Sequence, residues 1–148
     1  MSENLNLNLK ICNEHAKCPK YAYVGDAGFD LCSVDETELA PGERQMVHCG
    51  FSIAIPEGYC GLVIPRSGLA AKHGITVVNA PGLIDSGYRG EICVILLNTD
   101  KSKSFKINIG DRIAQMVISP YAKVDFSIVD KLDNTDRAEG RLGSSGIK

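Results

Sequence analysis

The sequence predicts one domain built almost entirely from β-strands, closed into a barrel or stacked as a sandwich. Short segments alternate apolar and polar residues, as strands with one buried face do. Turn-forming residues interrupt these segments at short spacing, which favours an all-β arrangement over βαβ units. With 148 residues and 44% hydrophobic content, the chain is long enough for one core and too short for two comfortable ones.

Strands are expected at several places along the chain. Alternation predicts them over residues 5–11, 51–55 and 105–109, each with one buried face. Two further segments, 62–64 and 93–97, are continuously apolar, so we expect other strands or another subunit to cover both of their sides. Turns are expected at Pro41-Gly42, Pro56-Glu57-Gly58 and Asp100-Lys101.

One short helix is expected, over residues 67–73. Ser67 suits its N-cap and Gly74 its C-terminal stop. Free N–H groups at a helix start attract anions, and the planar guanidinium of Arg66 suits phosphate oxygens. The alternative is an ordinary capped turn with a surface arginine.

The charge balance argues against a polymeric nucleic acid as partner. Sixteen Lys and Arg against 18 Asp and Glu give a net charge of -2, without the basic excess that phosphate neutralisation needs. The first ten residues have no basic start followed by an apolar stretch, and no segment approaches the length of a membrane span. These features predict a cytoplasmic protein with no membrane partner.

The cysteines are expected to be free thiols, most of them buried. No two are separated by two residues, and none of the three histidines is paired at ligand spacing, so the pattern favours neither a zinc site nor a disulfide framework. The six are Cys12, Cys18, Cys32, Cys49, Cys60 and Cys93. Free thiols fit a reducing compartment.

The segment from Ala80 to Glu91 carries the strongest functional signal. It places Asp85, Tyr88 and three glycines on a tight bend between two apolar runs, where backbone can approach a small flat ligand closely. Asp85 suits either a turn cap or a carboxylate that takes a proton from a positioned water. Tyr88 suits either a core position or a binding surface.

The chain changes character from Asp133 onward. Strand periodicity ends, and repeated glycines make the backbone permissive. The spacing does not match a Walker loop, because a glycine would have to stand where Ser145 is, and no helix follows. Two interpretations remain open, a disordered end and a mobile arm that closes over phosphates.

Five stretches in order closely resemble the motifs of the trimeric dUTP diphosphatases, across about residues 26–146. They are Asp26-Ala27-Gly28-Phe29-Asp30-Leu31, Pro65-Arg66-Ser67-Gly68-Leu69-Ala70, the 80–91 segment, Gly110-Asp111-Arg112-Ile113-Ala114-Gln115, and the tail from Arg137 to Gly146. The resemblance implies an all-β, jelly-roll-like barrel over residues 1–132, a flexible arm over 133–148, and a homotrimer. It also implies hydrolysis of dUTP to dUMP and pyrophosphate with Mg²⁺.

The resemblance implies roles for individual residues. Asp85 activates the water that attacks the α-phosphorus, and Tyr88 lies against the deoxyribose and excludes a 2′-hydroxyl. The base pocket is lined by Asn79, Leu83, Ile84 and backbone near Cys93, with a hairpin backbone matching the uracil edge. The phosphates are held by Arg66, Ser67, Gly68, Gln115, Arg137, Ser144 and Ser145. Asp30 meets Mg²⁺ through water, and Asp111 and Arg112 form a structural pair.

The tail departs from the family pattern. Gly140-Arg141-Leu142 replaces two glycines and an aromatic residue, so Leu142 covers uracil without stacking on it.

Two alternative functions stay open. A dCTP deaminase of the same fold would need a glutamate at the pyrimidine, where this chain has Ile84-Asp85-Ser86. The second alternative is a trimer that binds another protein under nucleotide control, a function that needs no catalysis.

Overall fold

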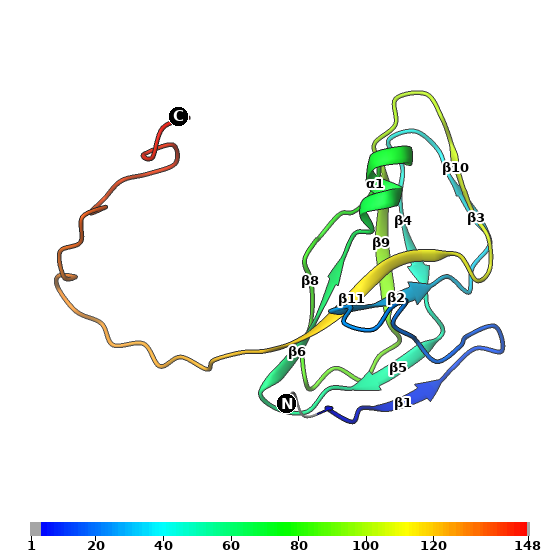
Figure 1. The fold of residues 1–148 in the computed structure, drawn as a ribbon, viewed down its shortest axis with the longest axis horizontal. Helices are drawn as coiled ribbons and strands as arrows, with labels where there is room; N and C mark the ends of the chain where they lie inside the picture. The colour runs from blue at the N-terminus through cyan, green and yellow to red at the C-terminus, as the bar shows by residue number, and fades with distance from the viewer. Residues whose placement is uncertain (1–3, 148) are drawn as a thin grey trace.

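The computed structural model describes residues 4–147 and confirms the all-β prediction (Figure 1). The described elements are β1 (Asn8–Ile11), β2 (Gly28–Cys32), β3 (Thr37–Leu39), β4 (Arg44–His48), β5 (Phe51–Ala54), β6 (Tyr59–Ile64), α1 (Ser67–His73), β7 (Ile75–Val77), β8 (Gly82–Ile84), β9 (Cys93–Asn98), β10 (Phe105–Ile107) and β11 (Arg112–Pro120). No helix among the described residues is long and apolar enough to cross a membrane.

Antiparallel pairing joins the strands into a jelly-roll-like barrel. The largest sheet has the order β2-β11-β6-β8, and a second has the order β4-β9-β7. Two further sheets of two strands each, β1-β5 and β10-β3, complete the barrel. Figure 1 shows the long strand β11 crossing the middle of the barrel between β2 and β6. This central strand therefore links the two segments on either side of it.

Burial alternates along the strands as their period of two requires. On β9, Val94 and Leu96 are fully buried, whereas Ile95 and Leu97 on the opposite face are half-buried. Within a single chain, segment 93–97 is therefore covered on one face only, and not on both faces as expected. The second face, which also carries Met46 at 59% exposure, stays accessible.

Three positions that the alternation pattern assigned to the core are exposed. Leu5 and Ile11 are 42% and 46% exposed, because β1 pairs only with β5 and lies at the edge of the barrel. Ile109 is 43% exposed because β10 ends at Ile107 and the chain then turns. The alternation pattern extended β1 and β10 beyond their ends at Leu5 and Ile109, whereas Ile11 lies inside β1 and is exposed at the edge.

The helix α1 occupies the expected residues but has a different N-cap. Its N-cap is Arg66, which makes no side-chain capping hydrogen bond, so the prediction that Ser67 caps the helix was wrong. The predicted stop at Gly74 is confirmed. Its φ of +66° is left-handed, its N–H donates to the Ala70 carbonyl, and a Cβ there would lie 2.7 Å from Thr99 Oγ1.

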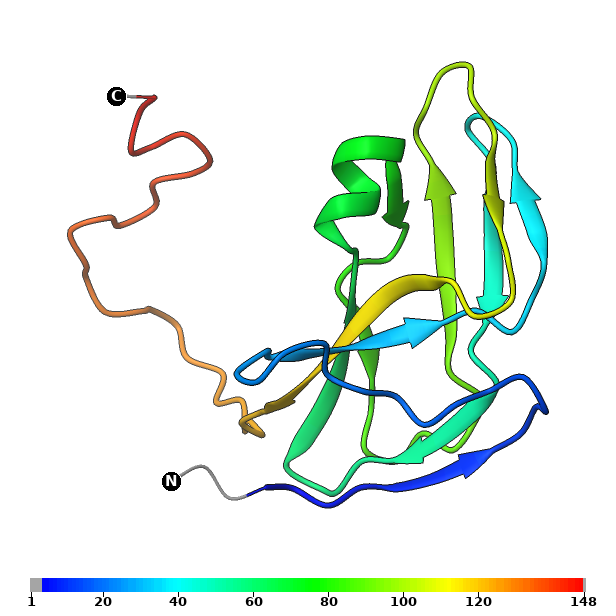
Figure 2. The same cartoon turned by 45° about the vertical axis from the view of Figure 1, so that its right-hand side comes forward.

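The chain beyond β11 leaves the barrel. Every described residue from 121 to 147 is exposed, and Figures 1 and 2 show this segment, orange to red, running away from the strands. Its first part alternates apolar and polar side chains, with Val124, Phe126 and Ile128 exposed by 65%, 90% and 101%. A strand-like pattern thus lies unpaired outside the domain.

Asn98 is expected to be a main stabilising polar residue of the core. Its fully buried amide donates to the carbonyls of Leu39 and Lys103, and its oxygen accepts from the Asp100 N–H. Asn98→Ala should lower the free energy of unfolding by about 3 kcal/mol, because these backbone groups lose their partners. The exposed Asn6→Ala serves as control in urea denaturation. Equal stability of the two variants would contradict the assignment.

Candidate phosphate and base site

The register of the large sheet brings three predicted phosphate motifs together. Gln115 on β11 pairs with Asp30 on β2 and with Ile64 on β6. Arg66 follows Ile64 by two residues, at the same end of the sheet. Residues far apart in sequence therefore meet at one place because antiparallel pairing fixes which positions are opposite.

A carboxylate flanked by two guanidinium groups lies at this place. Asp30 Oδ1 is 3.8 Å from Arg66 Nε, and Asp30 Oδ2 is 3.7 Å from Arg112 Nη1. Arg66 Nη1 also donates to the Arg112 carbonyl at 2.8 Å. Arg66 is thus a half-buried cation held by contacts to Asp30 and to the Arg112 carbonyl.

Gln115 is fixed on the other side of the same cluster. Its Nε2 donates to the Pro65 carbonyl at 3.1 Å, next to Arg66. A Cβ at Gly28 would lie 3.0 Å from Gln115 Oε1, so a glycine makes room for this amide. Ser67 and Gly68 follow as the exposed first residues of α1. Together these groups offer hydrogen-bond donors to a polyanion.

Asp111 and Arg112 do not pair with each other. The Asp111 carboxylate accepts the Asn108 N–H at 2.8 Å and closes the turn before β11. Arg112 instead faces Asp30. The two residues thus have separate partners, so the prediction that they form a pair was wrong.

The base segment is not the hairpin that the sequence suggested. β8 pairs with β6, whereas β9 pairs with β4 and β7, so the two apolar runs belong to different sheets. Gly82 packs closely against β6, where a Cβ would lie 3.3 Å from Val63 Cβ. The Asn79 amide also lies beside Gly82. The Leu83 side chain, on the next residue, is 60% exposed.

Tyr88 is held in place by the turn that contains it. Its N–H donates to the Asp85 carbonyl at 3.1 Å and its hydroxyl donates to the Glu91 carbonyl at 2.8 Å. A Cβ at Gly90 would overlap the Tyr88 ring, so only glycine allows this packing. Within residues 4–147 the exposed Asp85 carboxylate has no hydrogen-bond partner. Asp85 is therefore open to a ligand or water.

One chain does not bring Asp85 and Arg66 together. Because Ile84 pairs with Gly61, Asp85 lies beside Cys60, at the far end of β6 from Arg66. The six residue steps from Cys60 to Arg66 span about 20 Å at 3.3 Å per residue. The arm residues also lie away from both places, and Arg137 Nε contacts only the Gly140 carbonyl, at 3.3 Å, among described residues.

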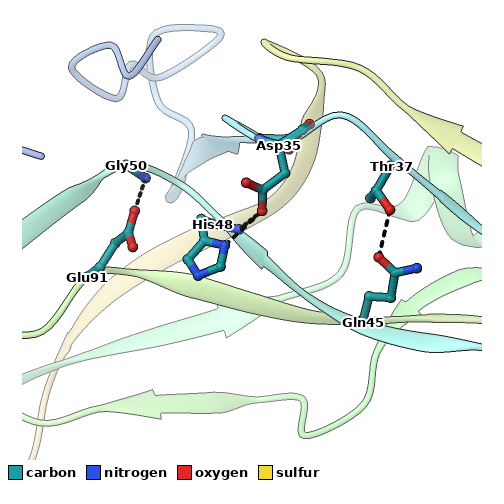
Figure 3. Close-up of polar contacts among 7 residues, drawn as sticks. Asp35, Thr37, Gln45, His48, Gly50 and Glu91 are labelled. Atoms are coloured by element: carbon teal, nitrogen blue, oxygen red, sulfur yellow. Dashed lines mark hydrogen bonds and ion pairs between the residues drawn. The ribbon is translucent and has the colours of Figure 1, made fainter. Parts of the chain in front are cut away.

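The structure reveals a second polar cluster that sequence spacing did not indicate. Asp35 Oδ2 accepts both the backbone N–H and the ring Nδ1 of His48, each at 2.8 Å (Figure 3). Glu91 Oε1 accepts the Gly50 N–H at 2.9 Å. Burial alone would raise the pKa of Asp35, but the hydrogen bonds from His48 outweigh it and lower that pKa. The bond to Asp35 in turn raises the pKa of His48.

All six cysteines are free, as predicted, but only two are buried. Cys49 and Cys60 are buried, Cys32 and Cys93 are half-buried, and Cys12 and Cys18 are exposed. Cys93 is paired with His48 across β9 and β4. Burial, with added repulsion from Glu91 and Asp35, raises the pKa of the Cys93 thiol to about 11.

The fold is thus an antiparallel barrel with an arginine–aspartate cluster at one end of the large sheet and an open carboxylate beside a fixed tyrosine at the other. The dUTPase family model matches residues 14–146. The chain belongs to the dUTPase family.

Close relatives support this assignment. The chain is 54% identical over 130 residues to the deoxyuridine 5'-triphosphate nucleotidohydrolase of Leifsonia xyli, covering 88% of this chain and 86% of that protein. The enzyme of the same name from Alkaliphilus metalliredigens is 50% identical over 143 residues, covering 97% and 99%. Neither relative carries the name of a deaminase.

A solved structure shares the fold. The dUTPase of Staphylococcus bacteriophage 80alpha, determined with dUpNHpp, superposes with a TM-score of 0.90 at 28% identity, covering 97% of this chain and 100% of that one. A phage phi11 dUTPase mutant, whose structure concerns the coordination of a structural Mg(II) ion, superposes with a TM-score of 0.82 at 26% identity, covering 88% and 100%.

The packing of Tyr88 predicts different effects at two glycines of one turn. Gly90→Ala should lower the free energy of unfolding by roughly 1 kcal/mol, because the new methyl group must displace the ring and its hydrogen bond. Gly87→Ala is the matched control, since no atom lies within 4 Å of its Cβ position. If thermal unfolding shows equal losses, the ring is not held as described.

Proposed function

We propose that this protein hydrolyses dUTP to dUMP and pyrophosphate, with Asp85 as the group that activates water. The observation that carries the proposal is the open Asp85 carboxylate beside the fixed Tyr88 ring in a member of the dUTPase family. The names of the curated relatives support the substrate.

Asp85 acts as a general base. An ionised carboxylate only accepts hydrogen bonds, so it can orient a water and take its proton. The water oxygen bonds to the α-phosphorus while the bond from that phosphorus to the bridging oxygen breaks. The electron pair of that bond leaves with pyrophosphate.

The segment around Asp85 recognises the nucleoside. The Tyr88 ring packs on the deoxyribose and leaves no space for a 2′-hydroxyl, which distinguishes dUTP from UTP. Backbone groups of the base segment pair with the uracil edge, and a mismatched edge leaves buried polar groups without partners. Asn79, Leu83, Ile84 and backbone near Cys93 line this pocket.

The cluster at the other end of the sheet binds the triphosphate. Its contacts come from Arg66, Ser67, Gly68 and Gln115, and the arm adds Arg137, Ser144 and Ser145, with Leu142 over the base. Mg²⁺ would offset the phosphate charge. Asp30, between two guanidinium groups at 3.7 and 3.8 Å, fits a contact through the waters that this ion retains rather than direct ligation.

The enzyme works as a homotrimer in which different copies supply the two parts of each site. Asp85 and Arg66 lie at opposite ends of β6, too far apart to act on one nucleotide in a single chain. The exposed apolar alternation of Val124, Phe126 and Ile128 supports an arm that packs on a neighbouring copy.

Asp85→Asn should lower dUTP turnover by about 100- to 10,000-fold, the range of a general-base contribution, while the fold is retained. Glu38→Gln, a charge-neutralising change at an exposed residue of β3, is the matched control. Pyrophosphate release reports the rate. Turnover of Asp85→Asn within threefold of the parent would show that Asp85 is not the base.

Phe126→Asp should weaken trimerisation, because a charge replaces an apolar side chain that is 90% exposed in the single chain. Val24→Asp, at a loop residue exposed by 107%, is the control and should leave the trimer intact. Light scattering measures the mass. A parent protein that is monomeric and fully active would contradict the trimer.

Removal of residues after Asn134 should leave the fold and the trimer unchanged but lower turnover far more than substrate affinity. The reason is that arm contacts matter most when water is excluded and charge develops at the α-phosphorus.

In calorimetry with a non-hydrolysable dUTP analogue, Leu142→Phe should tighten binding by up to about 1 kcal/mol. Leu132→Phe is its control. Unchanged affinity together with normal turnover of the truncated protein would identify the arm as a disordered end.

A further inference from the structure

Three side chains with metal-binding atoms converge beside the base segment. The ligand atoms of His48, Glu91 and Cys93 all lie within 4.8 Å of one another, and all three residues are half-buried. His48 and Cys93 are directly paired across β4 and β9, so strand pairing sets their separation. Glu91 lies two positions before Cys93, just ahead of the start of β9.

His48 is already oriented as a metal ligand. An ionised carboxylate only accepts, so the ring Nδ1–H donates to Asp35, and when the imidazole is neutral its lone pair lies on Nε2. Figure 3 shows the ring with its second nitrogen turned away from Asp35. A carboxylate that holds the far nitrogen of a histidine is the arrangement that fixes the tautomer in metal sites.

Glu91 is held in a similar way. One of its oxygens accepts the Gly50 N–H at 2.9 Å, and the other remains available. Gly50 is itself fixed, because a Cβ there would lie 2.7 to 2.9 Å from side-chain atoms of Ala16, Val34 and Asn13. Asp35 and Glu91 together make the cluster negatively charged around Cys93, which favours a cation.

We propose that His48, Glu91 and Cys93 bind a divalent transition-metal ion of the zinc class, at a site separate from the nucleotide phosphates. One nitrogen, one carboxylate oxygen and one thiolate are a donor set for Zn²⁺ or Co²⁺, whereas Mg²⁺ takes oxygen ligands. Tetrahedral bond lengths require ligand separations of roughly 3.3–3.6 Å, so the side chains need to close by about 1 Å. Water supplies the fourth ligand.

Such an ion would tie the start of β9 to the end of β4. Glu91 and Cys93 flank Ile92, directly after the turn that holds Asp85 and Tyr88. A ligand that binds only the folded protein stabilises it, so Zn²⁺ should raise the thermal unfolding temperature. The inference does not rest on dUTP hydrolysis and would stand if that activity were absent.

Titration of the full-length, chelator-treated and reduced protein with Co²⁺ tests the site. A thiolate-to-cobalt charge-transfer band should saturate at one ion per chain, and Zn²⁺ should displace it. Cys93→Ser should abolish the band, and His48→Ala should weaken Co²⁺ binding strongly. Asp35→Asn, which touches the ion only through His48, should weaken it by about 10- to 100-fold.

Two control variants separate this site from adventitious binding by other thiols. Cys12→Ser removes an exposed cysteine and Cys60→Ser a buried one, both outside the cluster, and the band should be unchanged in each. A charge-transfer band that persists in Cys93→Ser, or the absence of a saturable band in the parent protein, would overturn the proposal. Circular dichroism of each variant confirms its fold, so that a lost band is not a lost structure.

Discussion

The central position of β11 is the constraint on which the rest of the structure depends. This strand pairs with β2 along one edge and with β6 along the other, and the two registers fix Gln115 opposite both Asp30 and Ile64. A slip of one residue would turn every side chain of β11 to the other face and would both expose the core and disperse the phosphate cluster. Folding and site geometry are thus determined by the same hydrogen-bond ladder.

The same sheet also explains why Asp85 and Arg66 lie far apart within one chain. β8 continues the ladder beyond β6 in the antiparallel direction, so Asp85 leaves the sheet at the end opposite to Arg66. The separation is a consequence of strand direction and length and does not depend on side-chain rotamers. The proposed catalysis therefore involves a second copy, on which the exposed apolar residues of the arm can pack.

Much of this could be predicted from the sequence, because strand periodicity and motif order are local signals. Alternation identified the strands around Phe51 and Phe105, and the glycine stop of α1 was correct. The missed features depend on long-range pairing. The sequence does not state that β8 joins β6, that β1 is an edge strand exposing Ile11, or that His48 lies opposite Cys93. Local rules also assigned the N-cap to Ser67, whereas the N-cap is Arg66, whose side chain contacts Asp30 and the Arg112 carbonyl.

Complementation between two inactive variants tests most directly whether each site combines residues from different copies. Asp85→Asn and Arg66→Ala chains are mixed, unfolded together, refolded as mixed trimers and assayed for dUTP hydrolysis. We expect activity to recover at sites where an intact Asp85 meets an intact Arg66 from another chain. For random mixing, these are about a quarter of the sites. Mixed trimers, verified by native mass spectrometry, that stay as inactive as either parent would contradict it.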